Sequence, residues 1–232
     1  MIINNTQIPL ALSTTELPCF ANYVAGQNIE SVTAIRDFSK GEGENLIFLH
    51  GISGTGVSHL LQASTHLSSE LQQQAFYFSL AEPELSVEVL DQLEIFDVLC
   101  IDNIETVAGQ AEWEEALFHL FNQYRDSGKR LIIGSKTLPE NTQFELADLV
   151  SRFSGMVRYQ LKVLSDEDKN LAIIKRAENY GLTITPEVAN FMLTRGPRDL
   201  REIIGCVDKL DQASMISKRG ITIPLVKEVF GW

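Results

Sequence analysis

Long apolar runs are absent from this sequence of 232 residues. No run approaches the roughly 20 apolar residues that a membrane-spanning helix requires. The first residues, MIINNTQIPLALSTTELPCF, contain no basic stretch and no long apolar stretch, which argues against a signal peptide. We therefore expect a cytoplasmic protein with no membrane partner.

Cysteine is also scarce, and Cys19, Cys100 and Cys206 lie far apart without CxxC spacing. This pattern predicts no disulfide framework, and it fits a reducing compartment. His59 and His66 share one face of a predicted helix, but no cysteine or carboxylate joins them at metal-ligand spacing. We expect no metal site built on cysteine or histidine.

Positive charge is in short supply, with 19 lysines and arginines against 31 acidic residues and a net charge of −12. So acidic a chain does not by itself attract the phosphate backbone of DNA, although a local basic patch could still do so. The balance favours protein partners over autonomous DNA binding.

Apolar runs alternate with helical patterns through the first two thirds of the chain. Uniformly apolar strands separated by helices predict an α/β fold whose parallel sheet is covered on both faces. The predicted strands are 46–50, 75–80, 97–102, 130–135 and 157–161, and the predicted helices are 57–73 and 112–128.

The last seventy residues are predicted to be helical throughout. One helix begins after the N-cap candidate Ser165 and ends at Gly181, and a second opens at Thr185-Pro186. A third is opened by Gly196-Pro197 and reaches about Ser217, and Pro224 starts a short fourth. Residues 1–17 contain Pro9 and precede Pro18, so we predict a flexible arm there.

A glycine-rich segment follows the first predicted strand and enters a helix. It matches the phosphate-loop pattern G-x-x-x-x-G-K-[ST] except that valine stands where lysine belongs. Backbone N–H groups and the helix N-terminus favour an anion there, and Ser58 offers a hydroxyl to Mg²⁺. The alternative is a plain glycine turn. The predicted nucleotide-binding residues are Gly51, Gly54, Thr55, Gly56, Val57 and Ser58.

The missing lysine has an energetic consequence. Its ammonium group would neutralise the β- and γ-phosphates, and a charged hydrogen bond of that kind contributes on the order of 1.5–3 kcal/mol. Val57 supplies no such charge, and a triphosphate loses more than a diphosphate. We therefore expect weak binding with a preference for ADP and Mg²⁺, and no efficient ATPase activity by the chain alone.

A second motif supports the first. The buried run 97–102 ends in Asp102, whose carboxylate would lie beside the phosphate loop and hold the water shell of Mg²⁺. The next position, where a second acid commonly polarises the attacking water, is Asn103, and an amide is not a general base near neutral pH. The alternative reading of Asp102 is a strand-end turn residue.

Several further segments resemble AAA+ proteins of the DnaA initiator family, and in particular its regulatory members. The resemblance runs almost from end to end and implies a five-stranded parallel αβα sandwich at 18–162 with a small helical lid at 163–232. It places Asn28 in the segment that lies along the adenine. The matching segments are CFANYVAGQN, GTGVSHLLQA, CIDNIETVAG with the helix after it, LADLVSRF, LSDEDK and ITIPLVKEV.

The resemblance assigns roles to three arginines. Arg152, in LVSRF, matches the arginine finger that the family offers to the γ-phosphate on a neighbouring molecule. Arg198 matches the sensor 2 arginine of the lid, although Gly196 and Pro197 depart from the family pattern, and Arg201 is the competing candidate. Ser135 matches the sensor 1 position, where strand capping is an equal alternative.

The arm carries a peptide, QIPLAL, that resembles the Gln-Leu-x-Leu-x-Leu motif that docks into the sliding clamp of DNA polymerase. Gln7, Leu10 and Leu12 match the motif, and Ile8 takes a leucine position. A chance apolar tether is the alternative. DnaA itself carries a further C-terminal helix-turn-helix domain for DNA, which we do not expect after Trp232, so contact with DNA would be mainly indirect, through the clamp.

The implied function is negative control of replication initiation. Tethered to the DNA-loaded clamp, the chain would present Arg152 to ATP bound by DnaA and promote its hydrolysis in trans. One alternative is an autonomous AAA+ ATPase or loader, against which Val57 and Asn103 both count. Another is a nucleotide-free scaffold adaptor. The sequence leaves open whether the chain forms a homo-oligomer.

Overall fold

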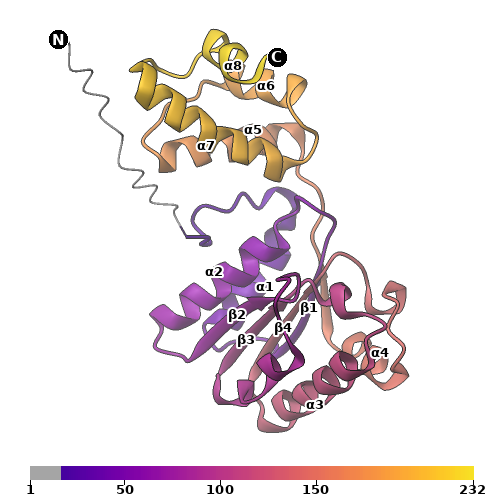
Figure 1. Ribbon diagram of the computed structural model, residues 1–232. Helices are drawn as coiled ribbons and strands as arrows, with labels where there is room; N and C mark the ends of the chain where they lie inside the picture. The colour runs from indigo at the N-terminus through magenta and orange to yellow at the C-terminus, as the bar shows by residue number, and fades with distance from the viewer. Residues whose placement is uncertain (1–16) are drawn as a thin grey trace, which may run out of the picture.

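Five parallel strands form the sheet of this computed structural model, which describes residues 17–232 (Figure 1). The strand order is β2-β3-β4-β1-β5, and each neighbouring pair is parallel. The expected five-stranded α/β fold is therefore confirmed. The strands are β1 (Leu46–His50), β2 (Ala75–Ser79), β3 (Val98–Asp102), β4 (Arg130–Ser135) and β5 (Val157–Gln160).

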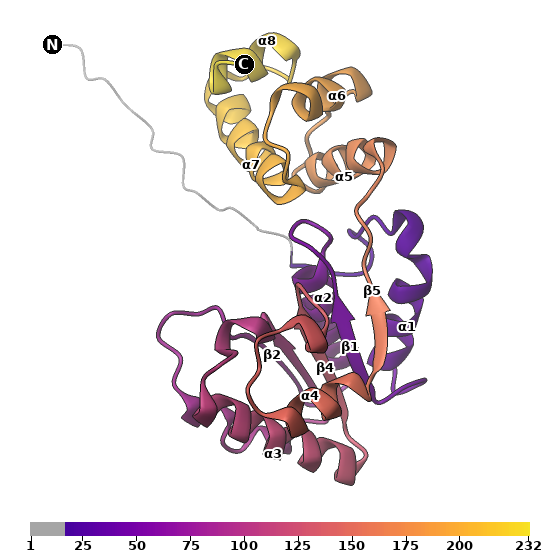
Figure 2. The same ribbon diagram turned by 90° about the vertical axis from the view of Figure 1, so that its right-hand side faces the viewer.

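Helices cover both faces of the sheet (Figure 2). Helices α1 (Ile29–Ser39) and α2 (Val57–Glu70) contribute to the apolar cluster on one face. Helices α3 (Ala111–Ser127) and α4 (Ala147–Ser154) contribute to the cluster on the other face. The αβα layering follows from strands that are apolar on both sides.

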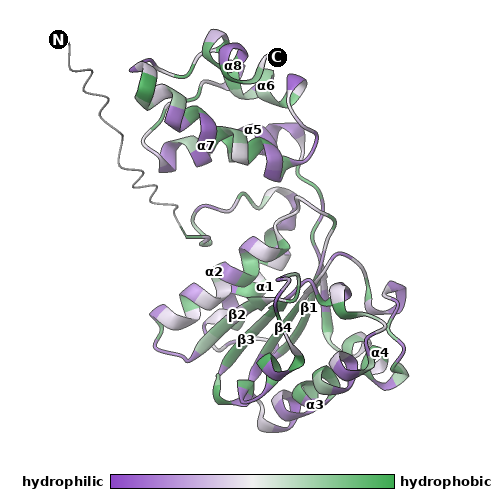
Figure 3. Cartoon of the chain, viewed as in Figure 1, coloured by the Kyte–Doolittle hydropathy of each residue, from purple (hydrophilic) through white to green (hydrophobic). Residues whose placement is uncertain are grey.

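The alternation of side chains along each strand divides the core. Ile47 and Leu49 of β1 pack with α1 and α2, whereas Phe48 between them packs with α3 and α4. The same division holds in β3, where Cys100 and Leu99 face opposite clusters. Successive strand residues point to opposite faces, so a run without polar residues fills two cores at once. Figure 3 shows these strands in hydrophobic colours inside the molecule.

Four helices beyond the sheet form a separate cluster with its own apolar centre, and we call residues 163–232 the lid. Ser165 and Thr185 cap the first two helices, because their hydroxyl oxygens accept from the backbone N–H groups of Asp168 and Val188. No helix in the described range 17–232 is long and apolar enough to cross a membrane. The lid helices are α5 (Asp166–Asn179), α6 (Pro186–Arg195), α7 (Leu200–Ser217) and α8 (Ile223–Phe230).

Besides small differences in where elements end, the structure departs from the prediction at three helices. Helix α7 begins at Leu200 rather than at Gly196-Pro197, because the carboxylate of Asp199 accepts from the N–H of Arg201 and caps the helix there. Helices α1 and α4 were not predicted. The absence of α4 from the prediction matters most, since Arg152 lies on this helix.

The cysteines behave as the sequence predicts. Cys19, Cys100 and Cys206 are unpaired. Cys100 is fully buried in β3, and burial raises the pKa of its thiol to about 12. A thiol with so high a pKa stays protonated at neutral pH, so Cys100 acts as a small apolar core residue.

The two-faced sheet core predicts a large difference between two isoleucines. Ile101 of β3 is 0% exposed and Ile216 of α7 is 74% exposed. We expect Ile101→Ala to lower the free energy of unfolding by about 2–5 kcal/mol because it leaves a cavity. Ile216→Ala, the matched control, should change it by less than about 0.5 kcal/mol. Urea denaturation of both variants measures the difference, and equal costs would contradict this description of the core.

Candidate nucleotide site

The glycine-rich loop joins β1 to α2 in the strand–loop–helix arrangement that the sequence predicts. The N–H of Gly51 donates to the carbonyl of Ser135 at 3.1 Å, which fixes the loop's start beside β4. Gly56 has φ +95°, and a Cβ at this position would lie 2.5 Å from Cε2 of Tyr23. Only glycine fits both the left-handed backbone and the close approach of the ring.

A cavity of about 720 Å³ lies over this loop, a volume in the range of nucleotide and cofactor sites. All of residues 51–58 line it, together with Asp102 at the end of β3 and Ser135 at the end of β4. Residues of the N-terminal segment and of the lid complete its walls. The carboxyl ends of parallel strands commonly form ligand sites of this kind.

Val57 lies at the start of α2 and is 8% exposed. It belongs to the apolar cluster under α1 and α2. A Cβ added to Gly134 of β4 would lie 3.1 Å from Cγ1 of Val57 and 2.8 Å from Oδ1 of Asp102, so the bare strand position lets both side chains approach. A largely buried apolar side chain therefore stands at the lysine position of the phosphate-loop pattern.

Asp102 is buried, with 2% of its surface exposed. One of its oxygens accepts from the hydroxyl of Tyr77 at 3.0 Å, and the other accepts from the N–H of Asn103 at 2.9 Å. Burial, followed by the charge of Asp102, raises the pKa of Tyr77 above its usual value. The carboxylate and the hydroxyl of Ser58 line the same cavity, and such oxygen ligands fit Mg²⁺, which commonly keeps several waters.

The two neighbouring polar positions are already engaged. Asn103 adopts a left-handed backbone with φ 55°, and its side-chain amide donates to the hydroxyl of Ser79 at 2.9 Å. The hydroxyl of Ser135 donates to Glu105 at 3.1 Å and accepts from the N–H of Thr137 at 3.2 Å. These contacts fit strand capping at Ser135, one of the two roles that the sequence left open.

Asn28 is not part of the cavity wall. Its amide nitrogen donates to the carbonyl of Lys162 at 2.9 Å, and its amide oxygen accepts from the N–H of Lys162 at 2.8 Å. Both ends of the side chain are thus used to join the N-terminal segment to the segment after β5. Tyr23 lines the cavity instead, and its hydroxyl donates to the carbonyl of Thr55 at 2.9 Å. Burial raises the pKa of Tyr23 to about 12.

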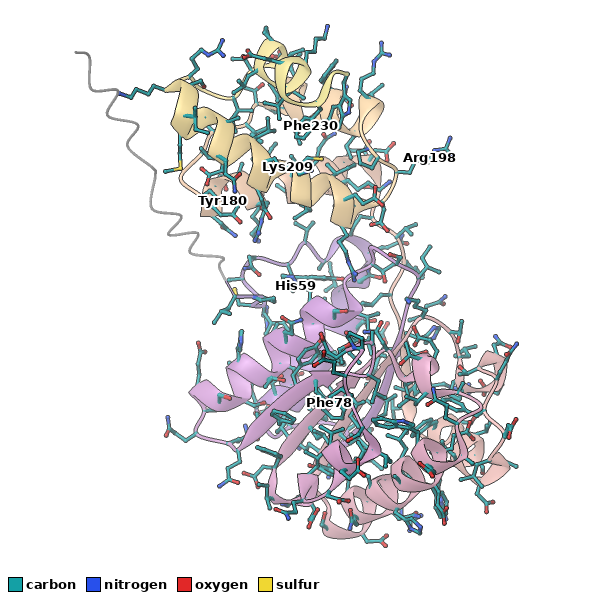
Figure 4. All side chains as sticks on the ribbon, viewed as in Figure 1. His59, Phe78, Tyr180, Arg198, Lys209 and Phe230 are labelled. Carbon is teal, nitrogen blue, oxygen red and sulfur yellow. The ribbon has the colours of Figure 1, made fainter. Side chains whose placement is uncertain are left out.

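Two histidines of α2 fasten the segment that leads into the site. A ring nitrogen of His59 donates to the carbonyl of Cys19 at 3.0 Å, and one of His66 donates to the carbonyl of Pro18 at 2.9 Å. The sequence shows both histidines on one helical face, but it does not reveal that they bind the backbone of Pro18 and Cys19. Figure 4 shows His59 at the boundary between the sheet part and the lid.

Of the two arginines that the sequence offered for the sensor 2 position, Arg201 lines the cavity and Arg198 does not. Arg198 is exposed, and Figure 4 shows it at the outer side of the lid, pointing away from the sheet part. The cavity wall contains Arg201, Arg176 and Lys136, and it does not include Arg198. Asp199 caps α7, which begins at Leu200, so Arg198 lies outside the helix.

Arg176 of α5 and Lys136 are cations of the cavity wall that sequence analysis missed. Arg176 is held in place by neighbouring side chains. Its guanidinium donates to Asp208 at 3.1 Å and to the hydroxyl of Tyr180 at 2.7 Å, and it lies 4.8 Å from the centre of the Tyr180 ring. An arginine held by an acid and a ring has a fixed direction. Helical spacing alone gave no sign that this side of α5 meets the cavity.

A lid carboxylate lies against the glycine-rich loop itself. Asp199 accepts from the hydroxyl of Ser53 at 2.8 Å. A Cβ added to Gly54 would lie 3.0 Å from the other oxygen of Asp199. A phosphate group and the carboxylate of Asp199 are both negatively charged, so they repel each other. The position of Asp199 therefore disfavours a further phosphate group of a nucleotide at this loop.

Arg152 lies outside the chain's own cavity. It is exposed on α4, and its guanidinium lies 5.8 Å from the centre of the Phe118 ring of α3. Its position leaves it available to another molecule rather than to a nucleotide bound by this chain. Gln7, Leu10 and Leu12 lie outside the described residues.

Two family models together match most of the chain. The bacterial DnaA ATPase domain matches residues 15–159, and the lid domain of Hda matches residues 166–230.

Solved structures agree with these matches. Domain III of the Thermotoga maritima replication initiation protein DnaA has a TM-score of 0.79 and 25% identity, covering 92% of this chain and 95% of that one. AMPPCP-bound DnaA from Aquifex aeolicus has a TM-score of 0.71 and 23% identity, covering 86% and 66%. RuvB from Thermotoga maritima shares the fold, with a TM-score of 0.68, 18% identity and coverage of 92% and 71%. The chain belongs to the bacterial DnaA ATPase family of AAA+ proteins and joins that domain to a lid of the Hda type.

Proposed function

We propose that this protein restrains replication initiation by promoting the hydrolysis of ATP bound to DnaA. The arm would tether it to the DNA-loaded sliding clamp, and Arg152 would act as an arginine finger in trans. The observation that carries the proposal is the position of Arg152, which is exposed and outside the wall of the chain's own nucleotide cavity.

The chemistry asked of Arg152 is electrostatic. As the terminal phosphoryl group is transferred, negative charge is redistributed over the phosphate oxygens. A positively charged guanidinium beside those oxygens stabilises the transition state. Phe118 supports the planar group from one side, at 5.8 Å, and leaves its N–H donors available. The support keeps a long, flexible side chain near one direction before the partner arrives.

The chain's own cavity would hold a nucleotide weakly and favour ADP. Backbone N–H groups of residues 51–58 would bind its phosphates, and Ser58 and Asp102 would hold Mg²⁺, which neutralises phosphate charge when bound. Val57 adds no charge, and Asp199 lies against the loop. Lys136, Arg176 and Arg201 are the cations in the wall.

An autonomous ATPase is disfavoured by the same residues. The apolar side chain at 57 leaves the phosphates without their usual lysine, and Asn103 has no carboxylate to orient a water. A scaffold adaptor that binds no nucleotide differs from our proposal in one measurable respect, which is nucleotide binding by the purified chain.

The first functional prediction concerns Val57. Val57→Lys should raise ATP affinity by about ten- to hundredfold, because the ammonium group restores about 1.5–3 kcal/mol of phosphate interaction. The gain for ADP should be smaller. Val57→Met is the matched control, with an unbranched stem and no charge. Calorimetry with both nucleotides measures the change, and equal affinities for the Lys and Met variants would contradict the role assigned to position 57.

The second prediction concerns the arm. Replacement of Gln7, Leu10 and Leu12 by Ala should abolish clamp binding and leave the melting temperature unchanged, because a proline-containing arm adds apolar anchors for a groove but little to the core. Replacement of Asn5, Thr6 and Ser13 by Ala is the control. The binding of both variants to immobilised clamp is measured. If the variant at Gln7, Leu10 and Leu12 binds the clamp as the wild type does, the tether lies elsewhere in the chain.

The decisive prediction concerns Arg152. Arg152→Ala should lower the stimulated hydrolysis of DnaA-bound ATP by about 10³–10⁵-fold, with clamp binding and melting temperature unchanged. Arg152→Lys should rescue little, because a point charge lacks the planar fork. Arg125→Ala removes another arginine from the surface and serves as control. Phosphate release is followed with clamp, DNA and DnaA–ATP, and a wild-type rate for Arg152→Ala would overturn the proposal.

A further inference from the structure

The helix that carries Arg152 is held at its start by a buried carboxylate. Glu114 of α3 is 1% exposed. It accepts hydrogen bonds from the N–H groups of Gly109 at 2.7 Å, Glu145 at 2.9 Å and Leu146 at 2.7 Å. In the described part of the chain no lysine, arginine or histidine forms an ion pair with it.

These bonds reach the residues where α4 begins. Leu146 is the N-cap residue of α4, and its own backbone N–H has no partner within the helix. Glu114 accepts this N–H from α3, as the carboxylate of a capping box accepts the N–H of the N-cap residue. Its negative charge also suits the N-terminus of a helix, where backbone N–H groups are free.

The hydrogen bond from Gly109 links Glu114, and through it α4, to the segment that follows Asp102, the predicted Mg²⁺ ligand. Gly109 comes after the short 3₁₀ helix Ile104–Val107, which begins two residues beyond Asp102. One carboxylate thus fixes two segments that are far apart in the sequence. A buried carboxylate is costly unless hydrogen bonds replace its lost hydration, and these three N–H groups replace it here.

Helix α3 supports the other end of the same arrangement. Phe118 lies one turn after Glu114 on α3, and its ring is the surface over which Arg152 sits. Leu149 and Phe153 of α4 are buried in the core, which fixes the rotation of the helix and turns Arg152 outward. The start of α4, its rotation and the placement of the Arg152 guanidinium are therefore all set by contacts with α3 and the core beside it.

We infer that Glu114 is a positioning residue for Arg152, a role that rests on the proposed function. It acts by setting where α4 starts, and Phe118 then receives the guanidinium. A displacement of a reacting group by about 1 Å costs as much as about a hundredfold in rate, so a loosened start of α4 lowers the rate without removing the arginine.

The test uses Glu114→Gln in the full chain, with clamp, DNA and DnaA–ATP. Glutamine keeps the shape but only one acceptor oxygen, so it cannot satisfy all three N–H groups. We expect kcat for stimulated hydrolysis to fall by about 10- to 100-fold with KM for DnaA–ATP unchanged. Glu115→Gln, its exposed neighbour, is the matched control and should retain wild-type kinetics.

Combination with Arg152→Ala separates positioning from other effects. In that background Glu114→Gln should cause no further loss, because the residue through which it acts is gone. Amide hydrogen exchange should rise in residues 145–154 of Glu114→Gln and stay unchanged in β3 and β4. If Glu114→Gln does not fold, Glu114→Asp, which keeps the charge but loses reach, is measured in the same way.

The outcomes are distinguishable. A wild-type rate for Arg152→Ala overturns the proposed function, whatever Glu114 does. A large effect of Arg152→Ala, together with an unchanged rate in Glu114→Gln or an equal further loss in the double variant, overturns only the positioning role. Unchanged exchange in residues 145–154 also overturns it.

Discussion

Burial of the central strands on both faces is the constraint on which the rest of the structure depends. All five residues of β3 are buried, and so are the last five of β4. Strands of this kind leave no face for polar groups, so polar residues gather where the strands end. Asp102 and Ser135 occupy those ends, and the phosphate loop leaves β1 beside them. The site is thus a consequence of the core.

The charge arrangement at the cavity differs from that of a self-sufficient ATPase. Asp102 has neutral hydrogen-bond partners, and the position of the usual loop lysine is apolar. Two of the three cations in the wall, Arg176 and Arg201, belong to lid helices. The lid also contributes an acid, Asp199, to the loop. Under the proposed function, nucleotide binding in this cavity would therefore depend on how the lid is positioned. ATP hydrolysis itself would take place on the partner.

Much of the fold was predictable because its signals are local. The strands 46–50 and 130–135 have the predicted bounds, since uninterrupted apolar runs between turn residues have few other readings. The caps Ser165 and Thr185 marked two lid helices correctly. Helix α4 escaped prediction because eight residues with only Leu149 and Phe153 fully buried give too short a periodic pattern.

The sequence by itself determined the parallel α/β fold, the glycine-rich loop between strand and helix with Val57 in it, and the acid at the end of β3, because each depends on residues close together in the chain. Only the tertiary structure decided which side chains meet. Asn28 joins Lys162, 134 residues away, rather than the cavity, and Glu114 reaches Leu146, 32 residues away. Likewise Arg201 and Arg176, not Arg198, line the cavity. Such contacts are set by how helices pack on the sheet and on one another, which no local pattern encodes.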